Sequence, residues 1–371
     1  MEASRLKSDG FWESAESIVL ENPRDSEACA EAGVIREWVA NQSEFSAYLL
    51  FRTSGSTGKG KWVVLSKVAL LASARAVNAF FAVTSRDRWL QTLPLFHVGG
   101  VGILARAYLA DCDVVNMEGK WDAERCHQLV IDYEVSFVSL VPAQLADFVR
   151  LKLRAPASLR VVLIGGGQLS DALYQQAVDL GWLISETYGM TETSSQIATA
   201  KVGSRELRIL PCWQVKKSAE GRLQVMGSPL LQAYLGVDKQ CFLEDPKEEG
   251  WLITSDLGEV NGDVLRVRGR VDRCVKILGE LINLGDIENQ IADMLKEFDC
   301  PETAFALVTR KDDRSSHKLV LVSENPFADE ILESYHQKCH PLHRIEEMLC
   351  IDVLPRTGIG KIDYVQLVEL L

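Results

Sequence analysis

The feature that most constrains this chain is a regular alternation of two kinds of segment across residues 48–187. Short runs rich in β-branched residues, such as 48–51 and 88–94, alternate with longer helix-like runs, such as 68–82 and 102–110. Strands that alternate with helices predict a parallel sheet covered by helices. Ligands of such sheets usually bind at the carboxyl ends of the strands, so a site is expected in the turns that follow them.

The pattern changes after about Lys201, where short strands separated by turn residues replace the alternation. Asn261-Gly262 stands between two of these strands and is a strong signal for a two-residue hairpin. From about Asp272 a third pattern mixes strands with helices. We therefore predict an α/β protein with two domains. Residues 1–270 form a large domain with the helix-covered parallel sheet and a β-hairpin-rich subdomain, and residues 271–371 form a small, mobile α+β domain.

Charge and composition argue against several classes of protein. The net charge of −12 disfavours a nucleic-acid-binding protein, which needs a basic surface. No apolar stretch approaches the ~18 residues of a membrane span, and the N-terminal segment lacks the apolar core of a signal peptide. The nine cysteines are scattered singly, which is typical of reduced thiols. We therefore expect a cytoplasmic protein that acts on small molecules, and the sequence leaves a homo-oligomer open.

The most informative segment is TSGSTGKGK, residues 53–61, directly after a predicted strand. Its glycines let backbone N–H groups approach phosphate oxygens, and its hydroxyls and lysines add donors and positive charge. The spacing Gly55-x-x-x-x-Gly60-Lys61 nearly matches a P-loop, but Trp62 stands where Ser or Thr would hold Mg²⁺. A strand, not a helix, is predicted to follow. The segment therefore indicates a phosphate-binding loop of another kind than that of P-loop nucleotidases.

Other polar turns follow predicted strands. In ISETYGMTETSSQ, Tyr188 is suited to stack on an aromatic base, and Glu192 is suited to hold Mg²⁺ beside phosphates. The glycines 165–167 would let a flat ligand lie against the backbone, although a turn that opens a helix explains them equally well. Asp256 and Arg270 are suited to bind ribose hydroxyls, or they form a surface charge pair.

Seven segments occur in the order in which the adenylate-forming superfamily carries its motifs. They run from TSGSTGKGK through PLFHVGG, YGMTET, GRLQVMGSPLLQAY, TSD and GRVDRCVKILGE to RTGIGK, which places Lys361 on a glycine-rich turn. The chain therefore resembles this superfamily of acyl- and aryl-CoA synthetases, luciferases and peptide-synthetase adenylation domains. Within it, SLVPAQL, LIGGGQLS and YGMTETSSQ are most similar to the o-succinylbenzoate–CoA ligase family of menaquinone biosynthesis.

The resemblance implies two half-reactions. A carboxylate attacks the α-phosphate of ATP to give an acyl-adenylate and pyrophosphate; the small domain then rotates about Asp272, and the thiol of coenzyme A displaces AMP. The resemblance also implies Mg²⁺ at Glu192, Thr191 near the phosphates and Lys361 at the reacting oxygens of the first step. The residues that it assigns to ATP are Thr53, Ser54, Gly55, Ser56, Thr57, Gly58, Lys59, Lys61, Gly165, Gly166, Gly167, Tyr188, Asp256 and Arg270.

The implied acid would bind beside His97, which the resemblance places as a gate next to the reacting carboxylate. o-Succinylbenzoate has a second carboxylate, and a buried anion needs a cationic partner. Arg106 lies in the otherwise apolar run GILARAYLA, where it either extends to the surface or points at this carboxylate. The resemblance favours the second reading. The polar residues expected to share the task are Thr193, Ser194, Ser195 and Gln196.

The sequence departs from the superfamily pattern in three places. Gly60 and Leu284 stand where proline is common, and only 52 residues precede Thr53. The change at Gly60 should loosen the phosphate loop, and the short N-terminal part implies a reduced N-terminal subdomain. Two other functions remain open: another aryl- or acyl-CoA ligase, and an adenylation module that loads a separate carrier protein.

Overall fold

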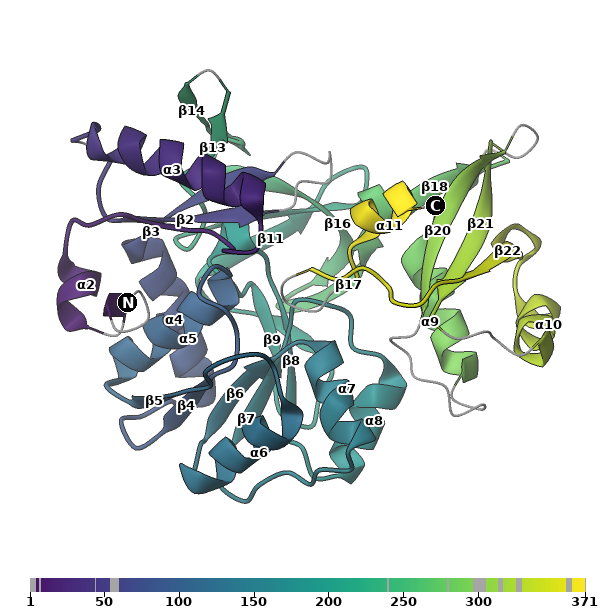
Figure 1. Cartoon of the computed structure of the whole chain (residues 1–371), viewed down its shortest axis with the longest axis horizontal. Helices are drawn as coiled ribbons and strands as arrows, with labels where there is room; N and C mark the ends of the chain where they lie inside the picture. The colour runs from purple at the N-terminus through teal and green to yellow at the C-terminus, as the bar shows by residue number, and fades with distance from the viewer. Residues whose placement is uncertain are drawn as a thin grey trace.

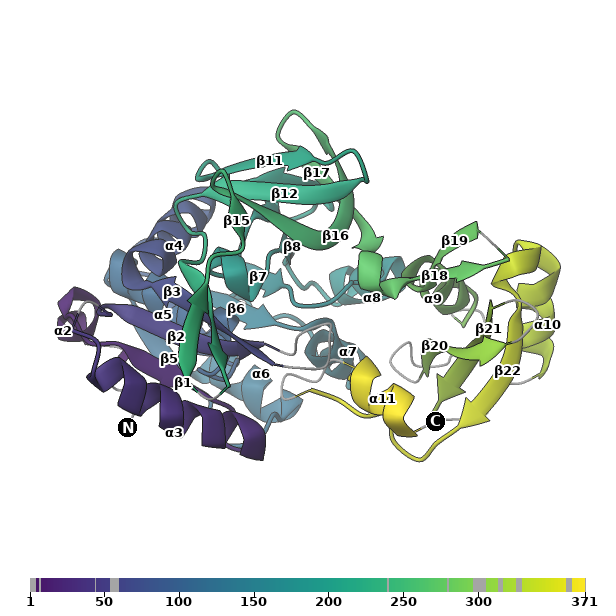
Figure 2. The ribbon, with the colours of Figure 1, turned by 90° about the horizontal axis from the view of Figure 1, so that it is seen from above.

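The structure is a computed structural model, and it describes residues 5–6, 8–43, 45–53, 60–238, 240–278, 280–295, 305–312, 316–324, 329–357 and 362–370. Figures 1 and 2 show one large body that contains the elements up to β17, with the elements from β18 onward gathered at one end of it. Within the described residues, no helix is both long and apolar enough to cross a membrane.

A large mixed sheet forms the centre of this body, and one part of it is parallel. The parallel strands are, in spatial order, β8 (Ile184–Tyr188), β7 (Val161–Ile164), β6 (Phe137–Leu140), β4 (Arg88–Gln91) and β5 (Asp113–Asn116). The helices that connect or flank them are α4 (Lys67–Phe81), α5 (Val98–Ala110), α6 (Ala123–Asp132), α7 (Pro142–Arg150) and α8 (Asp171–Asp179). The predicted α/β class, with a helix-covered parallel sheet, is confirmed.

The helices begin where the sequence supplies capping groups. Ser66, Asp122 and Ser170 each accept a hydrogen bond from a backbone N–H in the first turn of α4, α6 and α8, respectively. These bonds satisfy N–H groups that have no partner inside the helix. Helix α7 begins at Pro142, whose fixed φ suits a first helical position. Local sequence therefore sets where α4, α6, α7 and α8 begin.

The rest of the large sheet is antiparallel, as the hairpin pattern predicted. Its strands are β9 (Ala198–Ala200), β10 (Leu207–Ile209), β17 (Val264–Arg270), β16 (Trp251–Asn261), β12 (Arg222–Gly227) and β11 (Trp213–Lys217), with β15 (Lys247–Glu248) beside β16. The β16–β17 turn lies one residue later than predicted: Asn261 pairs with Val264, so the loop residues are Gly262 and Asp263. Strand β10 holds Asp263 in the loop, since Ile209 donates its N–H to the Asp263 carbonyl.

A second sheet lies beside the first and carries the predicted phosphate loop. Its strands are β1 (Ile18–Leu20), β2 (Tyr48–Thr53), β3 (Lys61–Ser66), β13 (Ala233–Val237) and β14 (Cys241–Glu244). Strands β2 and β3 form the antiparallel pair on either side of the loop, so a strand does follow it, as expected. Helix α3 (Ser26–Ala40) runs across one face of this sheet, and the short helix α2 (Asp9–Glu13) precedes β1.

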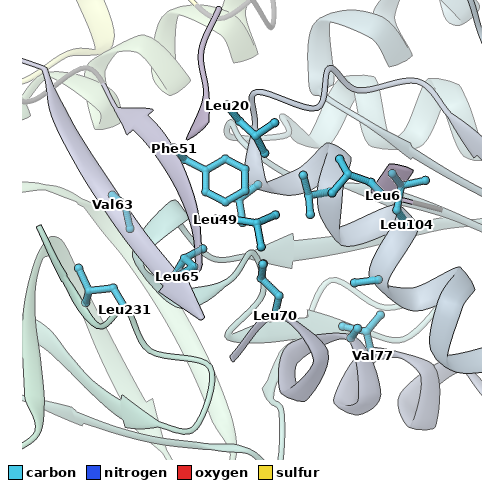
Figure 3. Close-up of a cluster of buried hydrophobic side chains, with 14 of the residues drawn as sticks. Leu6, Leu20, Leu49, Phe51, Val63, Leu65, Leu70, Val77, Leu104 and Leu231 are labelled. Carbon is cyan, nitrogen blue, oxygen red and sulfur yellow. The ribbon is translucent and has the colours of Figure 1, made fainter. Parts of the chain in front are cut away.

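Side chains of β2 and β3 are buried on both faces of this sheet. Leu50, Trp62 and Val64 pack against Ala32 and Ile35 of α3. Their neighbours point the other way because successive side chains of a strand alternate between faces. Figure 3 shows this second layer, which β2, β3, α4 and α5 share: Leu49, Phe51, Val63, Leu65, Leu70, Val77 and Leu104. The strands that flank the loop are therefore fixed by two hydrophobic clusters.

The elements after β17 form buried clusters of their own. After the short helix η2 (Val271–Arg273), they are β18 (Cys274–Ile277), β19 (Glu280–Asn283), α9 (Leu284–Leu295), β20 (Phe305–Asp312), β21 (Ser316–Ser323), α10 (Asp329–Lys338), η5 (Pro341–His343), β22 (Ile345–Cys350) and α11 (Tyr364–Leu370). Ile287, Ile291 and Leu295 of α9 pack against Leu307 and Leu321. A domain boundary between residues 270 and 271 and the mobility of the small domain stay predictions.

Candidate functional site

A hydrogen bond joins the two strands that flank the predicted phosphate loop at its root, where β2 ends and β3 begins. The hydroxyl of Thr53 donates to the carbonyl of Lys61 at 3.3 Å. The loop residues Ser54, Gly55, Ser56, Thr57, Gly58 and Lys59 lie outside the described residues, and so does Lys361. Their assignment to phosphates and to the reacting oxygens stays a prediction.

Helix α3 holds both strands at this root through a cluster of charges. The guanidinium of Arg52, on β2, pairs with Asp25 at 2.8 Å, with Glu31 at 2.9 Å and with Glu27. The indole N–H of Trp62, on β3, donates to the same Glu31 carboxylate at 2.8 Å. Helix α3 therefore holds Arg52 and Trp62, next to the loop, in place. The sequence alone did not reveal these contacts.

Gly60 makes room for this cluster. A Cβ atom at Gly60 would lie 2.6 Å from the guanidinium carbon of Arg52. We expected glycine in place of proline to loosen the loop. That expectation considered the loop alone and did not include the ion pairs of Arg52 beside Gly60.

Substituting Gly60→Ala is expected to lower the free energy of unfolding by about 0.5–1 kcal/mol, because the guanidinium at the end of the flexible Arg52 side chain must shift away from its partly exposed carboxylates. Thermal and urea unfolding would measure the change. Gly33→Ala is the control: Gly33 lies in α3, where an added Cβ meets nothing within 4 Å. There alanine should stabilise the helix by up to about 1 kcal/mol. Wild-type stability of Gly60→Ala would contradict this account.

Two of the three glycines after β7 are explained by features of the chain itself. A Cβ at Gly165 would lie 2.5 Å from the hydroxyl of Thr187 on β8, and Gly166 has a φ of +77°. Left-handed backbone of this kind favours glycine. Packing at Gly165 and a positive φ at Gly166 thus account for two of the three glycines without a ligand, and their place beside adenine stays a prediction.

The turn after β8 is tightly folded and strained. Gly189 passes so close to Ser195 that a Cβ would lie 1.6 Å from the Ser195 carbonyl oxygen. Ser194 and Ser195 have φ values of +50° and +97°, uncommon for residues with a side chain. Such strain persists only where surrounding contacts fix it, and it clusters at functional sites. The strain in this turn supports a functional role for the segment that carries Glu192.

Most of the polar residues expected to bind the acid already bond within the fold. The Thr193 hydroxyl bonds to the backbone of Met190, and that of Ser194 donates to the carbonyl of Pro229 at 2.8 Å. The amide oxygen of Gln196 accepts from Thr199 at 2.8 Å. These bonds hold the turn in shape. Their role in acid binding stays a prediction.

Tyr188, Asp256, Arg270 and Asp272 form one hydrogen-bonded chain. The Tyr188 hydroxyl donates to Asp256 at 2.6 Å, and Arg270, paired with Asp256 across β16 and β17, donates to it at 3.2 Å. Arg270 also binds Asp272 through two nitrogens, at 2.9 and 2.6 Å. Asp256 and Arg270 thus form an ion pair, but Asp256 is buried, so it is not the surface charge pair of the alternative reading. The predicted adenosine residues contact the predicted hinge. Burial, together with Asp256, raises the pKa of Tyr188, which keeps it a neutral donor.

Arg106 is buried, and the described residues supply no anionic partner for it. The residue is 2% exposed, and its Nε and Nη1 atoms have no hydrogen-bond partner among the described residues. The guanidinium lies 5.2 Å from the centre of the Trp89 ring, and a Cβ at Gly102 would be 3.1 Å from its Nη2 atom and 3.8 Å from the Cβ of Ser195. The reading in which Arg106 extends to the surface is therefore wrong. Burial lowers its pKa to about 10, so it stays cationic at neutral pH.

His97 and Glu192 are two further residues of the candidate site. His97 precedes the first turn of α5, the helix of Arg106, and its ring packs against Phe96. Glu192 lies beside Thr191 in the short helix η1 (Thr191–Thr193). Its carboxylate accepts a hydrogen bond from Tyr234, to which the sequence had assigned no role. The sequence could have pointed to Tyr234, because it is the one phenol in the otherwise apolar strand AYLGV.

Comparison with known proteins identifies relatives of the chain. A family model described as AMP-binding enzyme matches residues 6–229, more than half of the chain. A 2-succinylbenzoate–CoA ligase from Bacillus cytotoxicus is 34% identical over 248 residues, which are 62% of this chain and 51% of that protein. Another from Bacillus subtilis is 28% identical over 87% of this chain and 70% of its own length. The chain spans about half the length of the first curated relatives it matches.

The solved structures that match the chain include the same kind of enzyme. The o-succinylbenzoate CoA synthetase from Bacillus subtilis in complex with its acyl-adenylate intermediate matches with a TM-score of 0.74 and 26% identity, covering 86% of this chain and 68% of that one. The same synthetase with ATP and magnesium ion matches with a TM-score of 0.72 and 26% identity, covering 85% and 68%.

Proposed function

The chain belongs to the family of AMP-binding enzymes, and from this premise we propose that it ligates o-succinylbenzoate to coenzyme A through an acyl-adenylate, with release of AMP and pyrophosphate. The relatives named as ligases of this acid support the choice of substrate. The observation that carries the proposal is the buried guanidinium of Arg106, for which the described part of the chain provides no anion.

An unpaired buried charge is costly, and the cost is offset when an anion binds next to it. o-Succinylbenzoate has a carboxylate to react and a second one to be recognised. In this proposal Arg106 binds the second carboxylate, Ser195 lies close to it, and His97 lies next to the reacting one. A simple monocarboxylic acid would leave Arg106 unpaired.

Magnesium fits the residues that would hold it. The Glu192 carboxylate is bound by the neutral hydroxyl of Tyr234 and pairs with no described Lys or Arg. No three His, Cys, Asp or Glu side chains of the described part of the chain gather into a metal site. Mg²⁺ commonly takes one or two carboxylates together with substrate phosphates, so Glu192 would bind it alongside ATP. The ion would neutralise charge on the phosphates.

The other side chains would bind and orient ATP. Thr53 and Lys61 flank the loop that would hold the β- and γ-phosphates, and Lys61 adds positive charge. Tyr188 would lie beside adenine. Asp256 and Arg270 would take the ribose, with Tyr188 and Arg270 holding the Asp256 carboxylate in place. Catalysis of this kind depends on positioning and on charge stabilisation, the largest usual catalytic term.

The proposal is tested by acid-dependent exchange of pyrophosphate into ATP across a panel of carboxylic acids, followed by detection of the CoA thioester. Exchange that is strongest with o-succinylbenzoate, and a thioester with free coenzyme A, are expected. Exchange with a monocarboxylic acid instead would indicate another aryl- or acyl-CoA ligase. Exchange without transfer to free coenzyme A would favour the loading of a carrier protein.

The hinge assigned to Asp272 gives a separate prediction. Asp272→Pro fixes φ at this position and should leave adenylation largely intact while thioester formation drops, because the small domain can no longer rotate. The two half-reactions would be measured separately by pyrophosphate exchange and by single-turnover transfer to coenzyme A. Asp272→Ala is the matched control, since it also removes the ion pair with Arg270 but leaves φ free. Wild-type rates for both half-reactions in Asp272→Pro would place the hinge elsewhere.

A further inference from the structure

We propose that Tyr234 is a positioning residue for Glu192, whose carboxylate it holds in the orientation that binds a divalent cation beside the phosphates of ATP. The inference rests on the proposed function and adds to it a residue outside the roles assigned above.

The first observation is that one short segment holds Glu192 at two points. The hydroxyl of Tyr234, on β13, donates to the Oε1 atom of Glu192 at 3.0 Å. Three residues earlier, the N–H of Leu231 donates to the backbone carbonyl of Glu192 at 2.8 Å. Both the side chain and the main chain of Glu192 are therefore fixed relative to β13, although Glu192 itself lies in a strained turn.

The second observation connects the same tyrosine to the root of the predicted phosphate loop. On β13, which pairs with β3, Tyr234 lies opposite Val63. The ammonium group of Lys61, where β3 begins, lies 4.8 Å from the centre of the Tyr234 ring. A cation over the face of an aromatic ring is attracted to it. One side chain thus contacts both the last lysine of the loop segment and the carboxylate expected to bind the metal.

The hydrogen bond fixes a group that would otherwise rotate. The terminal torsion of a glutamate is broad, so a carboxylate without a partner samples many orientations. With Oε1 bonded to the phenol, the carboxylate has one preferred orientation, and lone pairs on its oxygens remain for a cation. A phenol titrates only at about pH 10, so it is a protonated donor at physiological pH.

Tyr234→Phe removes the hydroxyl and keeps the ring. Groups that orient a metal ligand typically contribute 10–100-fold to metal affinity. We expect Mn²⁺, followed by electron paramagnetic resonance in the presence of a non-hydrolysable ATP analogue, to bind about tenfold more weakly to the variant. The half-saturating Mg²⁺ concentration in pyrophosphate exchange should rise by a similar factor, while the KM for the acid changes less than about twofold.

The matched control is Tyr335→Phe, which removes a phenol that donates to the carbonyl of His343 at 2.9 Å in the C-terminal part of the chain. Thermal unfolding of both variants would measure how much stability each loses when its tyrosine hydrogen bond is removed. Mn²⁺ affinity should stay at the wild-type level in Tyr335→Phe. Equal weakening of Mn²⁺ binding in both variants, or none in Tyr234→Phe, would overturn the role of Tyr234.

A double variant separates positioning from a general effect on the site. Glu192→Gln removes the carboxylate, so adding Tyr234→Phe to it should weaken Mn²⁺ binding no further. Additive losses would show that Tyr234 acts independently of Glu192 and would overturn the inference. A wild-type protein that shows no acid-dependent exchange with any acid, yet binds Mn²⁺ and the ATP analogue in a Tyr234-dependent way, would reject the proposed ligase and leave this role of Tyr234 standing.

Discussion

Replacing Lys361 by alanine is expected to slow acyl-adenylate formation by about 100-fold or more, which is the usual scale for loss of one well-placed electrostatic group. The second half-reaction, thioester formation from a supplied acyl-adenylate and coenzyme A, should continue near the wild-type rate. Lys361 lies outside the described residues, and the prediction rests on the similarity of RTGIGK to the adenylation motif of the superfamily.

Pyrophosphate exchange would measure the first half-reaction and single-turnover thioester formation the second. Lys338→Ala is a suitable control, since Lys338 is an exposed lysine at the end of α10 in the same part of the chain. It should leave both rates unchanged. Equal damage to both half-reactions in Lys361→Ala would remove the lysine from this role.

The fold was predictable where a local pattern determines it. Alternating strands and helices specify the parallel sheet because each helix must cover the sheet between two parallel strands. Caps such as Ser66 and Ser170 and the proline at 142 mark the helix starts in the sequence itself. The β16–β17 turn lies one residue beyond its sequence signal, and there Asp263 accepts a hydrogen bond from Ile209 of β10, a contact that the turn signal does not contain.

The candidate site was predictable only as far as its motifs reach. Arg52 meets Glu31 from 21 residues away, and Tyr234 meets Glu192 from 42 residues away. Both contacts depend on how elements far apart in the sequence pack together, α3 against β2 and η1 against β13, and the sequence patterns do not contain that packing. The glycines at 165 and 166 show the converse: a pattern that suggested a ligand is explained by packing against Thr187 and by a positive φ.

Arg106 combines a motif-based expectation with a structural observation. The sequence alone allowed the side chain to reach the surface, and the structure excludes this reading because the residue is 2% exposed. Nothing in the described residues neutralises its charge, so the site carries the cost of a buried cation. Functional sites commonly retain such destabilising groups. Arg106→Met, which fills a similar space without charge, should therefore fold at least as stably as the wild type in urea unfolding.

The same guanidinium should determine the choice of acid. Arg106→Ala is expected to raise the apparent KM for o-succinylbenzoate by at least about tenfold, or about 1.4 kcal/mol, because the second carboxylate loses its cation. The KM for ATP should change little, since ATP is assigned to other residues. Benzoate-like acids without the second carboxylate are the matched substrates: their weak turnover should not depend on residue 106. Unchanged kinetics with o-succinylbenzoate, or an equal loss of activity with both kinds of acid, would mean that Arg106 does not bind the second carboxylate.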